Sequence, residues 1–400
     1  MNRDLLVFGE DWGAHPSSTQ HLIRQLAQHY RILWVNSIGL RRPRLCLRDL
    51  RRVAEKLQNM CQPLATAAPS AASASASLGN MRILQPRVLS WPGNPLARRL
   101  NRLLLGRQLR QAMAEMGMHR PLVWTSLPTA VELLDLLDPA AVIYYCGDDF
   151  AALAGVDHRA VARLEQQLVA RADLVLAASS TLLQRFPAAK SHLLAHGVDA
   201  RPFASPYPRP ADLPAGKPIM GFYGSLSSWL DIDLLLAVAR ALPHWNLVLI
   251  GPLQCDLGQL LQLANVHWLG PKAHSELPAY VGHWQVSLLP FLDNAQIRAC
   301  NPLKLREYLA SGKPLVSTDF PALQPYRQHV RVANGAAEFV HAIRQAALDA
   351  PHHQQRWLEQ LHCWRDVSQL AVAQQQRQSS VAGESWEVRA NALRTLLAGL

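Results

Sequence analysis

The chain has 400 residues, of which 49% are hydrophobic and only 17% are charged, so it can bury two cores of ordinary size and is not expected to be disordered. Its six cysteines are scattered, without paired or histidine-rich ligand spacings, which argues against a disulfide framework and against a metal site and favours a reducing cytoplasm. No run of about 18 uncharged apolar residues occurs, so we expect neither a signal peptide nor a membrane-spanning helix.

The first half of the chain predicts a doubly wound parallel sheet in an N-terminal domain, residues 1–205, because short apolar runs alternate with amphipathic stretches. The expected strands are 5–9, 32–36, 122–126, 141–146 and 174–178. The expected helices are 19–29, 96–116, 129–137 and 158–171.

The loop after the first expected strand, residues 9–18, lacks the Gly-x-Gly-x-x-Gly fingerprint, so it is not a dinucleotide site. We interpret it as a loop that binds a substrate with hydroxyl groups, which could accept a transferred group and is called the acceptor below. Asp11 or His15 could orient an acceptor hydroxyl, and Trp12 could stack on a sugar ring. Capping of the following helix by Ser17, Ser18 or Thr19 explains part of the same composition.

Positive charge is concentrated at the N-terminal end: residues 1–110 carry a net charge of +12, which leaves −1 for the rest. Within it, segment 41–57 alternates arginines with leucines, a pattern that suits an anionic membrane surface, although a solvated helix that keeps the protein soluble is the simpler alternative. No nucleic-acid motif accompanies the charge, so we expect no nucleic-acid partner. Segment 62–79, rich in Ala, Ser and Pro, is predicted to be a flexible insertion.

Two adjacent carboxylates, Asp148 and Asp149, follow the expected strand 141–146 and Gly147. Either could act as the general base that deprotonates an acceptor hydroxyl. Adjacent side chains on an extended chain point in opposite directions, so at most one should serve. Capping of the next helix is an equally good explanation for Asp149.

A proline-rich stretch, residues 202–214, predicts an interdomain linker. A second α/β domain is expected at residues 216–375, with strands 219–223, 246–250, 266–269, 286–291 and 315–318. Residues 376–400 resume helical periodicity and predict a terminal helix. No histidine other than His15 and His196 has a partner spacing that suggests catalysis, and we expect most of the sixteen to be surface or packing residues.

The segment from Asn301 to Asp319 predicts a helix, a glycine stop, a proline and a strand. Its first turns place Lys304 and Glu307 together. The N-H groups of a helix start and an added lysine attract phosphate, and a carboxylate one turn later accepts hydrogen bonds from sugar hydroxyls. Phosphate and ribose are therefore the expected ligands.

This segment resembles the donor-binding helix of the group 1, family 4-like glycosyltransferases, in a divergent branch found in polysaccharide and teichuronic-acid biosynthesis. The resemblance implies the GT-B fold: two Rossmann-like domains facing a cleft, with the C-terminal helix crossing back to the N-terminal domain. The family's second glutamate, which holds the ribose, falls on Glu307, whereas its first falls on Ala299 and is absent. The family's basic pair in the first loop of the C-terminal domain is replaced by Ser225 and Leu230.

By resemblance, the implied function is sugar transfer from a nucleotide-diphosphate sugar to a lipid-linked glycan, without a metal or other cofactor, on the inner face of the cytoplasmic membrane. Two alternatives stay open: a GT-B epimerase that acts on the nucleotide sugar itself, and a non-catalytic nucleotide-sugar-binding subunit. The implied donor-binding residues are Gly224, Ser225, Leu226, Gly270, Pro271, Lys272, Asn301, Pro302, Lys304 and Glu307.

Overall fold

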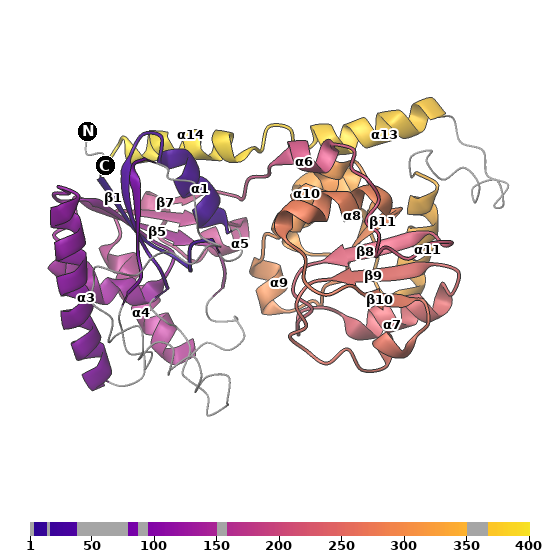
Figure 1. Ribbon diagram of the computed structural model, residues 1–400, viewed down its shortest axis with the longest axis horizontal. Helices are drawn as coiled ribbons and strands as arrows, with labels where there is room; N and C mark the ends of the chain where they lie inside the picture. Colours follow the sequence, from indigo (N-terminus) through magenta and orange to yellow (C-terminus); the bar gives the residue numbers. More distant parts are fainter. Residues whose placement is uncertain (1–3, 14–16, 38–78, 87–94, 150–157, 350–366) are drawn as a thin grey trace. The chain divides into compact units, whose positions relative to one another are not determined.

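The computed structural model (Figure 1) describes residues 4–13, 17–37, 79–86, 95–149, 158–349 and 367–400. The chain divides into two compact units, the first formed by residues 1–194 and 390–400 and the second by residues 195–389. The expected basic segment 41–57 lies outside the described residues, as does all of the expected insertion except Gly79.

The division lies before the proline-rich stretch rather than within it. Helix α6 (Ala200–Ala204) packs on α10 (Leu303–Ser311) and therefore belongs to the second unit. The terminal helix α14 (Trp386–Leu397) begins in the second unit, and its residues from Ala390 onward belong to the first.

The first unit is built on a seven-stranded, all-parallel sheet with the order β3-β2-β1-β4-β5-β6-β7. The five expected strands are present. Strands β3 and β7, at the two edges, were not expected, because short and partly exposed edge strands carry little apolar pattern. The strands are β1 (Asp4–Phe8), β2 (Arg31–Val35), β3 (Met81–Leu84), β4 (Leu122–Thr125), β5 (Ala141–Cys146), β6 (Leu174–Ala177) and β7 (Ser191–Leu193).

The helices of the first unit connect these parallel strands. Helix α1 begins where Ser17 Oγ accepts a hydrogen bond from the N-H of Gln20 at 3.1 Å, as expected for a serine N-cap. The segment expected as helix 129–137 is wound as a 3₁₀ helix. The helices are α1 (Ser18–Leu26), α3 (Pro95–Glu115), η1 (Pro128–Leu136), α4 (His158–Arg171), α5 (Ser180–Leu183) and η2 (Ala188–Lys190).

The second unit is built on a six-stranded parallel sheet with the order β10-β9-β8-β11-β12-β13, which repeats the order of the first six strands of the other sheet. The order reverses between β8 and β11. In open α/β sheets this switch point opens a crevice at the carboxyl ends of the strands, where ligands bind. The strands are β8 (Ile219–Tyr223), β9 (Asn246–Ile250), β10 (Val266–Trp268), β11 (Val286–Leu289), β12 (Leu315–Ser317) and β13 (Arg331–Val332).

Helices cover this sheet and bury Trp284 against it. A Cβ atom at Gly221 of β8 would lie 1.8 Å from the Trp284 ring, so only glycine admits the indole at this place. Among the described helices, none has the length and apolar character needed to cross a membrane. The remaining helices are α7 (Ile232–Ala241), η3 (Gly258–Gln262), η4 (His274–Glu276), α8 (Leu277–His283), α9 (Ala295–Ala299), η5 (Pro321–His329), α11 (Ala336–Ala347) and α13 (Val367–Ser379).

A partly buried ion pair joins α10 to the turn before α14. Arg306, 4% exposed, donates from Nε to Glu384 Oε2 at 2.6 Å, and Glu384 also accepts from Tyr326 and pairs with Arg389. Burial opposes ionisation of Glu384, but Arg306, Tyr326 and Arg389 outweigh it and hold the pKa of this carboxyl below its usual value.

Glu384→Gln is therefore expected to destabilise the protein by about 2 kcal/mol at pH 7, because Arg306 loses its counter-charge inside the protein. Since the folded-state pKa is lowered, this stabilisation is present above the unfolded pKa and is lost as the pH falls through the folded one. Urea unfolding between pH 3 and 7 measures both effects. Glu387→Gln, on the exposed face of α14, is the control and should change stability by less than about 0.5 kcal/mol.

Candidate functional site

Three glycines stand at the carboxyl ends of adjacent strands in the second unit: Gly224 after β8, Gly251 after β9 and Gly270 near the end of β10. All three have positive φ, at 135°, 140° and 70° respectively. The Gly251 N-H donates to Gly270 O at 2.9 Å, and a Cβ atom at Gly251 would lie 1.9 Å from Gly224 O. The strand ends therefore pack backbone against backbone at Gly224 and Gly251, whereas the space beside Gly270 is open, since a Cβ atom there would meet nothing within 4 Å.

Lys304 lies against the first of these glycines. A Cβ atom at Gly224 would stand 2.8 Å from Lys304 Nζ, so the ammonium group and the β8 turn are in contact. The ammonium also lies 5.2 Å from the ring centroid of Phe222 and 5.7 Å from that of Phe291. Burial lowers the pKa of Lys304, although the nearby Glu307 carboxylate opposes that shift. The structure thus brings together Gly224 and Lys304, which are 80 positions apart in the sequence.

Helix α10 has the predicted form. It runs from Leu303 to Ser311 with Pro302 as its N-cap residue, ends at Gly312 in the left-handed conformation (φ 71°), and is followed by strand β12. Glu307 lies one turn after Lys304 and is buried. One carboxylate oxygen accepts a hydrogen bond from the Tyr223 hydroxyl, and the other lies 2.6 Å from His274 Nε2.

His274 was not predicted as part of the site, although it is hydrogen-bonded to Glu307. Its hydrogen bond to Glu307 raises the pKa of His274, although burial opposes the shift. The sequence separation of 33 residues gave no hint of this pair. Tyr223 was likewise missed, although it occupies the last position of β8, immediately before Gly224.

The other predicted donor residues occupy varied places around this edge. Ser225 is half-buried and Pro271 is exposed, both on loops after the strands, while Leu226 is fully buried. The Lys272 ammonium turns to Asp212 at 2.6 Å. Asn301 is buried and accepts a hydrogen bond from Arg306 at 2.7 Å, so its side chain links the residues before α10 to the helix itself.

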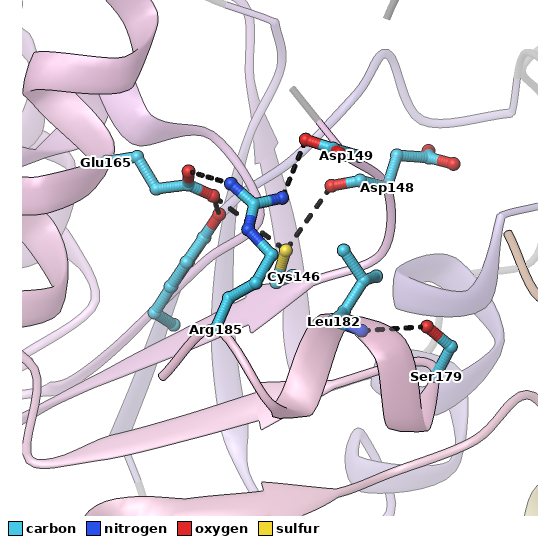
Figure 2. A network of polar contacts seen from close by, with 8 residues as sticks. Cys146, Asp148, Asp149, Glu165, Ser179, Leu182 and Arg185 are labelled. Carbon is cyan, nitrogen blue, oxygen red and sulfur yellow. Dashed lines mark hydrogen bonds and ion pairs between the residues drawn. The ribbon is translucent and has the colours of Figure 1, made fainter. Parts of the chain in front are cut away.

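In the first unit, Asp148 and Asp149 follow β5, and Figure 2 shows their carboxylates turned in different directions. Asp149 pairs with Arg185 at 2.6 Å, and Arg185 also reaches the buried Glu165 at 3.3 Å. Asp148 accepts from Cys146 Sγ only through its backbone oxygen. Asp148 is exposed, whereas Asp149 is half-buried beside Arg185, so Asp148 is the carboxylate that a substrate hydroxyl can reach.

The expected acceptor loop follows β1. Asp11 accepts from the Ser37 N-H at 3.0 Å, so it holds a neighbouring loop. The Trp12 ring packs edge-on against Trp34 with centroids 4.8 Å apart, and the Arg24 guanidinium lies 5.2 Å from its centroid. His15 lies outside the described residues. Within the described residues, no three His, Cys, Asp or Glu side chains are grouped so that they could hold a metal ion.

Glu10 was not predicted, although it is the most buried carboxylate of this loop. Ser17 donates a hydrogen bond to it, and burial raises its pKa, with smaller contributions from the charges of Asp11 and Asp148. Glu10 and Asp148 therefore lie near each other at the carboxyl edge of the first sheet.

Parts of the chain are similar in sequence to known glycosyltransferases. Residues 217–349 match the family described as "Glycosyl transferases group 1". Over 140 residues the chain is 31% identical to the putative teichuronic acid biosynthesis glycosyltransferase TuaH of Bacillus subtilis (strain 168). That match covers 33% of this chain and 35% of TuaH, so it spans about a third of the length of this relative.

Solved structures are similar over the whole length. HepE of Anabaena in complex with UDP and glucose has a TM-score of 0.65 at 14% identity, with 99% of both chains covered. Sucrose-phosphate synthase from Thermosynechococcus elongatus has a TM-score of 0.68 at 16% identity, with all of both chains covered. Together with the two parallel sheets, these similarities confirm the predicted GT-B fold.

Proposed function

We propose that this chain, a group 1 glycosyltransferase with the GT-B fold, transfers a sugar from a nucleotide-diphosphate sugar held in its second unit to a glycan acceptor. The observation that carries the proposal is the contact of Lys304 with the Gly224 turn, with Glu307 one turn further along α10. A cation, a glycine turn and a carboxylate thus lie together at the switch point of a parallel sheet.

Each element has a role in the proposed reaction. The Lys304 ammonium and the N-H groups at the start of α10 bind the diphosphate and stabilise the negative charge that grows on it as the sugar leaves. Glu307 accepts hydrogen bonds from the ribose hydroxyls. The backbone at Gly270, Pro271 and Lys272 contacts the base. We assign no metal or other cofactor to this step.

The acceptor is proposed to be a lipid-linked glycan of cell-surface or extracellular polysaccharide. The similarity to TuaH, a putative teichuronic acid biosynthesis glycosyltransferase, supports this class. The excess positive charge of residues 1–110 supports peripheral attachment, through segment 41–57, to the anionic inner face of the cytoplasmic membrane.

The donor site is tested by thermal unfolding with UDP, GDP, dTDP and CMP. HepE was solved with UDP and with UDP-glucose, so UDP is the first choice. A ligand at 100 times its dissociation constant adds about 2.7 kcal/mol, enough for a shift of several degrees. Stabilisation by one nucleoside diphosphate, reduced in Glu307→Gln, supports the assignment. No shift with any nucleotide in the folded protein contradicts it.

The two aspartates after β5 give a second test. If Asp148 is the general base, Asp148→Asn should lower kcat about 100-fold without changing the thermal unfolding temperature. Asp149→Asn is the matched comparison: it breaks the pair with Arg185 and should lower stability more than it lowers kcat. Initial rates and thermal unfolding of both variants decide between them, and the opposite pattern assigns the base to Asp149.

A further inference from the structure

We infer that His274 is a positioning residue that orients Glu307 so that its remaining lone pairs face the ribose of the nucleotide. The inference rests on the proposed function, since it requires the ribose to bind at Glu307. It assigns a role to a histidine that lies on the short turn η4 and comes from a different part of the chain than α10.

Geometry shows how Glu307 is held. A glutamate has three rotatable side-chain bonds, so one hydrogen bond leaves its carboxylate plane free to turn. Here Tyr223 holds one oxygen from the sheet side, and His274 holds the other at 2.6 Å. An ionised carboxylate has about four acceptor positions, so two held by protein donors leave two for vicinal hydroxyl groups.

The two anchors differ in exposure. Tyr223 is buried, and its own N-H donates to the Tyr308 hydroxyl at 3.0 Å, so this anchor is fixed in the core. The His274 side chain is 38% exposed, whereas that of Glu307 is 11% exposed. His274 is therefore the anchor that solvent and pH can reach.

The surroundings of His274 favour its charged form. Glu307 faces it from α10, Asp199 contributes a second negative charge from the turn before α6, and the Phe203 ring meets it edge-on with centroids 6.0 Å apart. The hydroxyl group of Tyr223, on β8, donates a hydrogen bond to the other carboxylate oxygen of Glu307. A protonated imidazole makes a charge-assisted hydrogen bond, which is shorter and stronger than a neutral one. The hold on Glu307 should thus weaken as the pH rises through the raised pKa of His274.

The experiment is titration calorimetry with three probes: UDP, 2′-deoxy-UDP and inorganic pyrophosphate. The wild type should bind UDP about tenfold more tightly than 2′-deoxy-UDP, since one hydrogen bond to a charged group is removed. His274→Ala should lose most of this preference while its pyrophosphate affinity stays unchanged. His274→Gln keeps an N-H donor and should retain the preference but lose the pH dependence between pH 6 and 8. His244→Ala, an exposed histidine of the same unit, is the control.

The outcomes separate the two levels of the proposal. An unchanged ribose preference in His274→Ala, or tighter binding of UDP by it, overturns the positioning role; tighter binding would mean that His274 occupies the place of the ribose. A ribose preference that survives in Glu307→Gln overturns instead the assignment of the ribose to Glu307. Loss of the preference in Glu307→Gln and in His274→Ala, with rescue by His274→Gln, supports both.

Discussion

Lys304→Met is expected to lower kcat/KM for sugar transfer by about 1,000-fold while leaving the protein folded. Methionine keeps a straight apolar side chain against Phe222 and Phe291, so the change removes the ammonium and little else. The lost interaction is the one that strengthens as charge develops on the departing diphosphate, and for that reason the effect should fall on kcat as well as on KM.

The stability of Lys304→Met should be higher than that of the wild type or unchanged. Burial lowers the pKa of Lys304, which means that the folded protein disfavours its charged form, so an apolar replacement removes an unfavourable term. Initial rates of nucleoside diphosphate release and thermal unfolding are measured on the same preparations. Lys217→Met is the control, because Lys217 is exposed and its ammonium donates to Pro243 O at 2.9 Å. A normal rate in Lys304→Met would contradict the donor site.

Gly251→Ala should destabilise the second unit by about 3 kcal/mol or more and abolish nucleotide binding. Its φ of 140° is unfavourable for alanine, and the new Cβ atom would lie 1.9 Å from Gly224 O. Because the obstacle is backbone, the β8 turn must move, and it carries Gly224 away from Lys304.

Urea unfolding and UDP titration measure the two effects of this change separately. The matched control is Gly282→Ala: Gly282 lies within helix α8, has ordinary φ, and a Cβ atom there meets nothing within 4 Å. That replacement should stabilise the protein by about 0.5–1 kcal/mol, since alanine is the better helix former. Full nucleotide binding by Gly251→Ala would show that the three glycines at the ends of β8, β9 and β10 are not part of the site.

The elements of this protein that could be predicted from the sequence are those whose signals are local. The helix, glycine stop and strand after Asn301 are specified within twenty residues, and the structure reproduces each of them, including the left-handed Gly312. The expected central strands are likewise present in both sheets. Strands β3 and β7 lacked such a signal, because edge strands need not be apolar on either face.

The site was predicted less completely, because its contacts join distant segments. Glu307 and Lys304 could be found from one helix, but Tyr223 is 84 residues from Glu307, and the pairing depends on how β8 meets α10. Gly251 did have a signal that was not used: three successive strands of the second unit are each closely followed by a glycine. The partnership of Arg306 with Glu384, 78 residues apart, had none.

The most direct test of the proposed function is transfer of labelled sugar from a panel of nucleotide sugars, UDP-glucose first, to lipid-linked glycan acceptors. We predict that label appears in the lipid fraction together with an equal amount of nucleoside diphosphate, and that both are lost in Lys304→Met. An epimerised nucleotide sugar formed without acceptor would contradict transfer and indicate an epimerase. Binding without transfer or hydrolysis would contradict it equally and indicate a non-catalytic subunit, the alternative to which the alanine at position 299 gives some support.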